Sequence, residues 1–435
     1  MDRCGVRYVL QFNFMCKVGV FLVPLICHAA TYTSASCGAA DFQAQINNSA
    51  NGDVVQGPVA GGSATWTSGV TVGNTHQITL NGNACSVTFG SGGSLSLTVG
   101  SSNYTRVTNF TFNGSGTNGN DVIEFHTVTS PASLTFRFDH NTLSCGSPSA
   151  PSTILGIYQN GPGLVDHNSF SCGHGADELI HVLGLGASDD SGWWDTVSIG
   201  GANMIFIEDN TFSDSGGAGA SALQSYYGAR TVIRHNTFTN MQLDQHGSGG
   251  IGARWWEIYS NTFSTQDGIC LRAGSGMVFS NITTGAIRMT QEYGTYPAEW
   301  QVGQGQETVH GSPTNCSTNG PPGCYFAYVW NDVTPSLNTT QGCAAGLANM
   351  IHFERDVFAQ NDGGNGVRSG TYASIPGTCS TYQGYWATDQ STLYQCTATN
   401  TWTAYYTPYT YPHPLTLIGV AGQSIMMLSG SGTWK

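Results

Sequence analysis

A short motif recurs six times in the middle of this chain, and three of its copies read FDHNTL, VDHNSF and IEDNTF. The Asn of the motif stands at positions 141, 168, 210, 236, 261 and 281. Repetition of one unit every 20 to 50 residues is typical of a solenoid, in which each copy forms one coil stacked on the last. No other feature of the sequence restricts the fold as strongly.

The apolar residues of the motif predict the local structure of each coil. The residue three places before each Asn is Phe, Val or Ile, and the residue two places after it is apolar in five of the six copies. Apolar residues that alternate with polar ones indicate a strand with one buried face. The Asn then falls at a bend, where its amide can bond to the backbone and to the Asn of the next coil. We therefore expect parallel strands joined by an internal ladder of Asn side chains.

Strands of this kind, Gly-rich bends and the IxxNxF pattern occur together from about residue 104 to 285. In these features the chain resembles the pectate lyase-like superfamily. The resemblance implies an all-β, right-handed parallel β-helix over residues 31–370, with an insertion at about 290–348. IHFERDVF, with Asp356 in the place of the Asn, predicts one further coil. No catalytic motif of a characterised family matches, so the resemblance implies a scaffold, and a fold alone does not define a function.

The two ends of the chain have their own compositions. Basic residues, an apolar run and small residues follow one another in residues 1–30, which predicts a signal peptide and a secreted or cell-surface protein. Residues 371–412 are rich in aromatic residues and predict a disulfide-pinned hairpin that caps the helix, or alternatively a small sugar-binding module. Residues 413–435 are expected to form a tail or linker.

The cysteines support an oxidising compartment. Of the 13 cysteines, three precede residue 31, which leaves an even number in the remaining chain. Cys145 and Cys172 each follow a motif Asn by four residues, so adjacent coils should bring them within disulfide distance. Cys379 and Cys396 flank a hairpin pattern and form the second predicted disulfide.

The charge of the chain excludes some partners. The 13 Lys and Arg residues against 26 Asp and Glu give a net charge of −13, which argues against nucleic acid as a partner. No segment after residue 30 is apolar over a length that would span a membrane. We expect a monomer whose partner is an extracellular polysaccharide.

The repeat also aligns three carboxylates in neighbouring coils, at Asp139, Asp166 and Glu208, with Arg234 next in the row. Like charges about 4.8 Å apart repel one another unless they are solvated, protonated or bridged by a cation. Three interpretations stay open: a calcium site, which would be the one cofactor of the protein, an acid and base pair with Arg234 offsetting Glu208, or a solvated acidic ridge.

The resemblance implies a substrate groove along the strand that precedes each motif. The candidate acids and bases there are His181, Tyr226 and His246, and the candidate neutralising cations are Arg254 and Arg272. The candidate substrate-binding residues are polar or aromatic side chains that can bond to sugars or stack on them: Glu124, His126, Tyr158, Gln224, Trp193, Trp194 and Trp255.

Three functions fit these residues. We expect a lyase that cleaves an acidic, uronate-containing glycan by β-elimination, because this reaction needs a neutralised carboxylate, a base and an acid. The first alternative is a noncatalytic extracellular protein that binds glycans, mediates adhesion or has a structural role. The second is a glycoside hydrolase with paired carboxylates, supplied by residues around the strand of His181: Asp177, Glu178, Asp189, Asp190 and Asp195.

Overall fold

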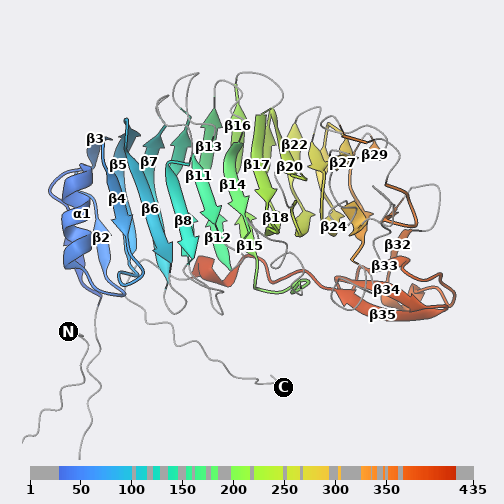
Figure 1. Cartoon of the computed structure of the whole chain (residues 1–435). Helices are drawn as coiled ribbons and strands as arrows, with labels where there is room; N and C mark the ends of the chain where they lie inside the picture. The colour runs from blue at the N-terminus through green and yellow to red at the C-terminus, as the bar shows by residue number, and fades with distance from the viewer. Residues whose placement is uncertain are drawn as a thin grey trace, which may run out of the picture.

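The chain winds into a parallel β-helix in which most coils contribute three strands (Figure 1). The computed structural model describes residues 29–99, 104–114, 121–127, 136–145, 153–158, 162–172, 178–184, 197–215, 220–247, 252–264, 268–292, 302–304, 325–334, 336–339, 346–347, 351–360 and 366–417. The predicted signal peptide therefore lies almost entirely outside the described residues.

The strand that precedes each motif belongs to a ten-stranded parallel sheet, which we call sheet B. It consists of β4 (Gly69–Val72), β6 (Ser94–Val99), β8 (Ile123–Thr127), β11 (Leu155–Tyr158), β14 (Glu178–Leu183), β17 (Ala220–Tyr226), β20 (Met241–Gln245), β23 (Ile269–Leu271), β26 (Ile287–Met289) and β29 (Leu337–Asn338).

The two strands of each motif belong to a 19-stranded sheet that divides into two ladders at the Asn bend. Ladder A1, before the bend, contains β1 (Thr31–Thr33), β2 (Val54–Gln56), the first parts of β5 (Thr79–Phe89) and β7 (Thr105–Asn113), β9 (Phe136–Asp139), β12 (Gly163–Asp166), β15 (Ile205–Glu208), β18 (Arg230–Arg234), β21 (Trp255–Tyr259), β24 (Ser275–Phe279), β28 (Ala327–Trp330) and β31 (Val357–Ala359). Ladder A2, after the bend, contains β3 (Gly62–Trp66), the second parts of β5 and β7, β10 (Thr142–Ser144), β13 (Ser169–Cys172), β16 (Thr211–Asp214), β19 (Thr237–Thr239), β22 (Thr262–Ser264) and β25 (Ile282–Thr283).

The bend between the ladders is built as the motif predicts. The residue before each Asn is left-handed, as at His140 with φ 54° and Asp209 with φ 57°. His, Asp and Asn adopt this conformation more readily than most residues, and His or Asp stands there in four copies. The Asn side chains then bond from coil to coil, for example from Asn210 Nδ2 to Asn236 Oδ1 at 3.1 Å. The predicted Asn ladder is confirmed.

The ladder extends one coil beyond the six copies of the motif. Asn281 donates from its backbone and its side chain to Asp332 Oδ1, at 2.8 and 2.9 Å, so Asp332 takes the next place. The sequence analysis assigned this coil to the insertion and put Asp356 in the ladder, which is wrong. Asp356 instead accepts hydrogen bonds from the His352 amide and the Arg355 side chain.

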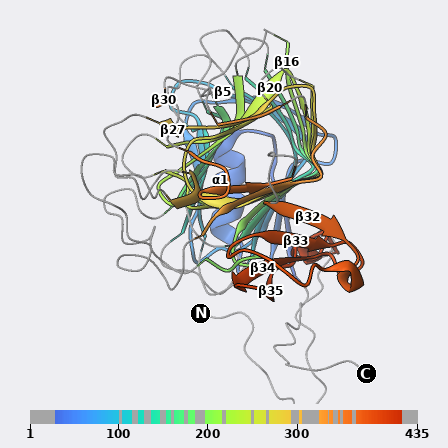
Figure 2. The ribbon, with the colours of Figure 1, turned by 90° about the vertical axis from the view of Figure 1, so that its right-hand side faces the viewer.

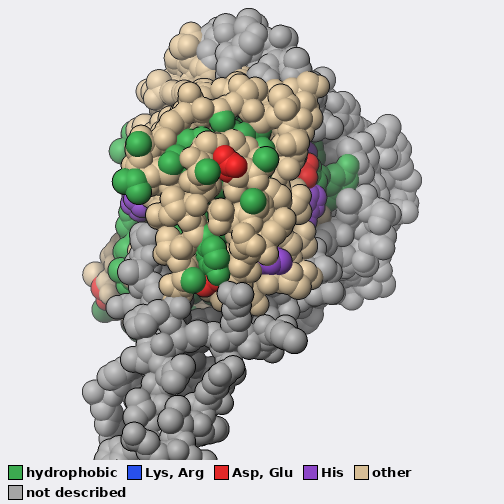
Figure 3. Space-filling model, turned by 90° about the vertical axis from the view of Figure 1, so that its left-hand side faces the viewer, with side chains coloured by type: hydrophobic (Ala, Val, Ile, Leu, Met, Phe, Trp, Pro, Cys, Tyr) green, Lys and Arg blue, Asp and Glu red, His purple; other side chains and the backbone are tan. Residues whose placement is uncertain are grey.

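Inside the helix, equivalent side chains stack in columns. The rings of Phe170, Phe212, Phe238 and Phe263 lie 4.4 to 4.9 Å apart and nearly parallel. Helix α1 (Ala39–Asn48) closes the N-terminal end by burying Phe42 and Ile46 in the same core. Figure 3 views this end and shows a largely uncharged surface. Because apolar columns fill the interior, the charged side chains lie on the outward faces.

Disulfides join neighbouring parts of the chain. Cys145–Cys172 and Cys379–Cys396 form as predicted, with Cα–Cα distances of 5.0 and 6.1 Å. Cys37–Cys85 was not predicted and ties the segment before α1 to β5. Cys270 is bonded to a cysteine outside the described residues.

The C-terminal part forms a four-stranded sheet, sheet D, followed by a segment that runs back along the helix (Figures 1 and 2). Sheet D consists of β32 (Val367–Gly370), β33 (Gly384–Ala387), β34 (Thr392–Ala398) and β35 (Thr401–Tyr406). It contains the predicted hairpin, but it packs against the side of the last coils, on the outward face of ladder A1. There its residues Trp386, Leu393 and Tyr406 share a second apolar core with Phe279 and Tyr328.

Smaller elements complete the described chain. The strands β27 (Gln291–Glu292) and β30 (Gly346–Leu347) pair antiparallel, and three short 3-10 helices occur: η2 (Val302–Gln304), η4 (Tyr372–Ser374) and η5 (Pro414–Leu417). Within the described residues, no helix is long and apolar enough to cross a membrane.

Candidate functional site

The acidic row of ladder A1 is fully buried and paired with arginines. Arg106 Nε donates to Asp139 at 2.6 Å, Arg137 Nε to Asp166 at 2.8 Å and Arg234 Nε to Glu208 at 2.7 Å. Burial acts to raise the pKa of Asp139, but the Arg106 hydrogen bond and the Arg137 charge outweigh burial and lower it. Asp139 is therefore an ionised partner of guanidinium groups. At Glu208 burial outweighs the Arg234 charge and raises the pKa.

The C-terminal segment of residues 407–417, which we call the strap, covers this row. Arg234 donates to the carbonyls of Tyr409 and Thr410 at 2.7 and 2.9 Å, and Arg137 donates to the carbonyl of Leu415 at 3.1 Å. The His413 amide donates to Glu208 at 2.8 Å. The predicted tail thus begins within a packed segment.

This arrangement corrects all three interpretations of the acidic row. Buried carboxylates bonded to arginines do not present an acid and base pair to a substrate. The row is covered, so it is not a solvated ridge, and the arginines hold the positions that a calcium ion would need. Within the described ranges, no group of three or more His, Cys, Asp or Glu side chains could hold a metal ion. Arg106 and Arg137, which lie on the same outward face two residues before the row, were the signal that the sequence analysis overlooked.

Sheet B presents a different set of polar side chains on its outward face. Its register aligns Glu124, Gly156, His181, Gln224, Asp244, Cys270 and Arg288 in one row. Two residues further along each strand, a second row contains His126, Tyr158, Leu183 and Tyr226, and His246 and Arg272 follow at the ends of the next strands. The side chain of His181 thus lies in the outward row, between Gly156 and Gln224 of the neighbouring strands.

The centre of this face is a chain of contacts across four coils. His181 lies between two carboxylates, with Nδ1 3.8 Å from Asp121 and Nε2 3.7 Å from Glu178. Tyr158 donates its hydroxyl proton to Asp121, and the Tyr226 hydroxyl lies 2.9 Å from Glu178. We call these five residues the Asp121–Glu178 cluster.

Gly156 makes this cluster possible. A Cβ at this position would collide with the carboxylate of Asp121 and with the ring of Tyr158. The missing side chain leaves a space in the outward row, and the carboxylate of Asp121 reaches into it from the preceding coil. Asp121 thereby approaches His181, which lies beside Gly156 in the next strand.

Burial changes the protonation of this face. It raises the pKa of Glu178, and the nearby charges of Asp121 and Asp244 add to the rise, against the opposing effects of His181 and Tyr226. It lowers the pKa of His246 to about 2, helped by the Arg272 charge. The face therefore combines a carboxyl group that holds its proton more tightly than usual with a neutral imidazole.

Aromatic and charged pairs flank the cluster on both sides along the helix. Toward the N-terminus, the His126 ring stacks on Tyr158 at 4.6 Å and its Nε2 lies 2.9 Å from Glu124. Toward the C-terminus, the His246 ring lies 4.2 Å from that of Tyr226. Next to it, Arg272 donates to Asp244 through Nε at 2.9 Å and through a second nitrogen.

Two of the predicted site residues lie elsewhere. Arg254 is buried with its guanidinium 4.7 Å from the centre of the Tyr325 ring, and burial lowers its pKa to about 9. Trp255 is buried in the core beneath sheet D and donates to Glu257 at 3.1 Å. Both residues belong to the A1 side of the helix. The remaining predictions fall outside the described residues: Trp193, Trp194, Asp177, Asp189, Asp190 and Asp195.

The sequence analysis missed Asp121 and Asp244. Asp244 directly follows the inward Leu243, and this alternation was sufficient to place it on the outward face. Asp121 lies before the first residue of β8, so only the space at Gly156 connects it with the site.

The fold makes this chain a parallel β-helix protein, and comparison with known proteins adds no family to this class. No family model matches the chain, and no curated protein is significantly similar to it. Its function must therefore be inferred from the site itself.

Proposed function

We propose that the outward face of sheet B cleaves glycosidic bonds of an extracellular polysaccharide by hydrolysis, with Asp121 and Glu178 as the two carboxyl groups. The observation that carries this proposal is the position of His181 between them, within 4 Å of both. Glycoside hydrolysis needs one carboxyl group that donates a proton and one carboxylate that accepts a proton or attacks.

The environments of the two groups support different roles. Burial raises the pKa of Glu178, so Glu178 would protonate the glycosidic oxygen. Asp121 accepts a hydrogen bond from Tyr158 and would accept the proton of an attacking water. The two residues come from alternate coils, whose backbones lie about 10 Å apart. Both side chains approach His181, which suits the separation of roughly 6.5–9.5 Å in inverting enzymes.

Cleavage by β-elimination is the second candidate, and the grouping of His181, Tyr226, His246 and Arg272 favours it. These side chains could remove and return protons while a cation neutralises a uronate. However, Arg272 is already bonded to Asp244, and Arg254 lies on the other side of the helix. A uronate would also meet Asp121 and Glu178. These charges support hydrolysis better than β-elimination.

The same proposal includes an extracellular location and a distant relationship to the pectate lyase-like superfamily. Five described disulfide cysteines lie in or beside the coils, and disulfides persist mainly in oxidising compartments. The Asn ladder and the polar outward rows on the strand before it support the relationship in scaffold.

The test is incubation of the purified protein with a panel of neutral and acidic polysaccharides. Hydrolysis releases reducing ends without ultraviolet absorbance, whereas β-elimination releases reducing ends together with an absorbing unsaturated sugar. We expect reducing ends alone, and their loss in Glu178→Gln and Asp121→Asn. Glu354→Gln, at an exposed position beside β31 on the A1 side, is the matched control and should retain most activity. Release of no reducing ends from any polysaccharide would contradict the proposal and favour a noncatalytic glycan-binding protein.

A further inference from the structure

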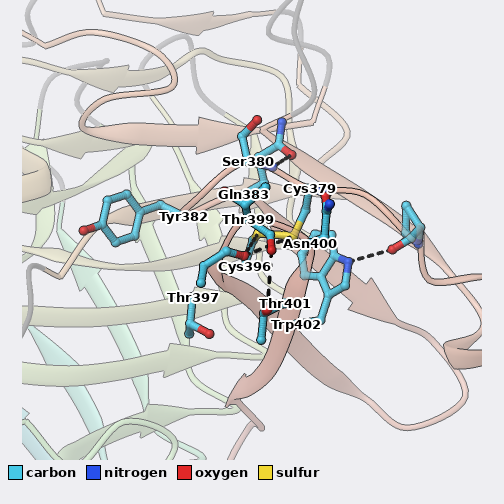
Figure 4. The surroundings of a disulfide bond; sticks show 12 residues. Cys379, Ser380, Tyr382, Gln383, Cys396, Thr397, Thr399, Asn400, Thr401 and Trp402 are labelled. Carbon is cyan, nitrogen blue, oxygen red and sulfur yellow. Dashed lines mark hydrogen bonds between the residues drawn. A yellow bond between two sulfur atoms is a disulfide. The ribbon is translucent and has the colours of Figure 1, made fainter.

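The outer side of sheet D carries a second group of aromatic residues, remote from the core that joins this sheet to the helix. A segment of residues 371–380 crosses this outer side and is held there by the Cys379–Cys396 disulfide. Trp402 donates from Nε1 to the Pro376 carbonyl at 2.8 Å, and Tyr385 donates to the Thr371 carbonyl at 2.9 Å. Figure 4 shows the disulfide with Trp402 beside it. These contacts fix the position of η4, which begins at Tyr372.

Tyr372 and Tyr394 form an exposed pair of rings on this outer side. Tyr372 is 44% exposed, and its ring centre lies 5.1 Å from that of Tyr394, which is only partly buried. Polar groups border the pair: Tyr394 donates to Gln390 at 2.5 Å, and Asp389 accepts from the Tyr372 amide at 2.7 Å. Asp389 and Gln390 are both exposed. The pair thus combines apolar ring faces with hydrogen-bonding groups at their edge.

Packing does not account for these two rings. Sheet D contacts the helix through its other face, by way of Trp386, Leu393 and Tyr406. A stable protein partner would need about 800 Å² of this surface, which is far more than two tyrosine rings provide. The charge that acts on the hydroxyls of Tyr385 and Tyr394 is that of Asp389, which repels anions. A small, uncharged ligand with apolar faces and hydroxyl groups fits these conditions.

We propose that Tyr372 and Tyr394 bind neutral sugar residues of a polysaccharide and anchor the protein to it, separately from the site on sheet B. The sugar would stack on the ring of Tyr372 and bond to Gln390 and Asp389 through its hydroxyls. The class of ligand rests on the function proposed above, whereas the position of the site rests on the exposed rings alone.

Affinity electrophoresis of the full chain tests this site. Native gels containing hydroxyethylcellulose, xylan or mannan should retard the protein in at least one case. Tyr372→Ala should raise the dissociation constant about tenfold, while cleavage of short soluble oligosaccharides stays unchanged. Tyr411→Ala is the matched control, since Tyr411 is also 44% exposed but lies in the strap. Thermal unfolding shows whether each variant is folded.

The outcomes separate the two proposals. Retardation that Tyr372→Ala and Tyr411→Ala leave equal, or the absence of retardation by all three polysaccharides, overturns the sugar site. Retardation that depends on Tyr372 without any cleavage would support the sugar site and contradict the hydrolase. Glu178→Gln should be retarded like the unaltered protein, because its substitution lies on sheet B.

Discussion

Two outward faces of one helix carry carboxylates in register, and their surroundings differ. On ladder A1, Asp139, Asp166 and Glu208 are bonded to arginines and covered by the strap. On sheet B, Asp121 and Glu178 contact tyrosine and histidine side chains that can exchange protons. A guanidinium fixes the charge of a carboxylate, whereas a phenol or an imidazole leaves its protonation free to change.

The comparison shows why one row of carboxylates in a repeat is structural and another is available for chemistry. Both faces present polar rows because strands alternate their side chains, but only a covering segment turns such a row into part of the core. Sheet D and the strap supply that cover on ladder A1. A row of carboxylates in a solenoid therefore indicates a site only where its partners are not arginines.

The largest expected effect is on the covered face. Arg234→Leu leaves Glu208 buried without its cation and removes the bonds to the strap at Tyr409 and Thr410. We expect a loss of about 3–5 kcal/mol in the free energy of unfolding, measured by denaturant titration. The double variant Arg234→Leu, Glu208→Gln should recover part of that loss, because the buried charge is then absent. A loss below about 1 kcal/mol would mean that the row behaves like a surface ion pair.

The second prediction concerns sheet B, where a substitution should reduce activity and leave stability nearly unchanged. Glu178→Gln should lower the rate of glycan cleavage by a factor of about 10²–10⁴, the usual contribution of a general acid. Its free energy of unfolding should change little, since the amide can still bond to Tyr226. Steady-state rates and denaturant titration on the same sample check both parts. Equal loss of activity in Glu354→Gln would show that the assignment of the acid is wrong.

Two carboxyl groups, Glu178 on sheet B and Asp139 on ladder A1, should respond to pH with opposite sign. The pKa of Glu178 is raised in the folded protein, so its contribution to stability declines as pH rises from its ordinary value of 4.5. The pKa of Asp139 is lowered, so its contribution is present above 3.8 and is lost as pH falls through the folded value. Midpoints of thermal unfolding between pH 3 and 8 should therefore rise with pH for Glu178→Gln relative to the unaltered protein. A difference that shrinks with pH would contradict the raised pKa.

The sequence predicted the scaffold in detail because the motif repeats. Each Asn fixes the register of its neighbours, and this register placed Cys145 beside Cys172 and His181 on the outward face. It could not reveal that Gly156 makes room for Asp121, because that contact joins residues at different positions of adjacent coils. It also could not reveal the strap, because the segment that covers Arg234 lies about 175 residues later in the chain and has no repeat of its own.

The smallest expected effect concerns Asp332, which follows Asn281 in the Asn ladder. Its carboxylate accepts hydrogen bonds from Asn281, and among the described residues neither an arginine nor a tyrosine is bonded to it. Burial raises the pKa of Asp332 to about 7, although two hydrogen bonds from Asn281 oppose the rise, and its Oδ2 is buried without a hydrogen-bond partner. Asp332→Asn should add about 1 kcal/mol of stability above pH 7, because an amide can donate where the carboxylate cannot. The gain should fall to near zero as pH drops from 7 toward 3.8, since the protonated Asp332 then resembles the amide. Thermal unfolding of both proteins across this range measures the difference, and a gain independent of pH would show that Asp332 is ionised throughout.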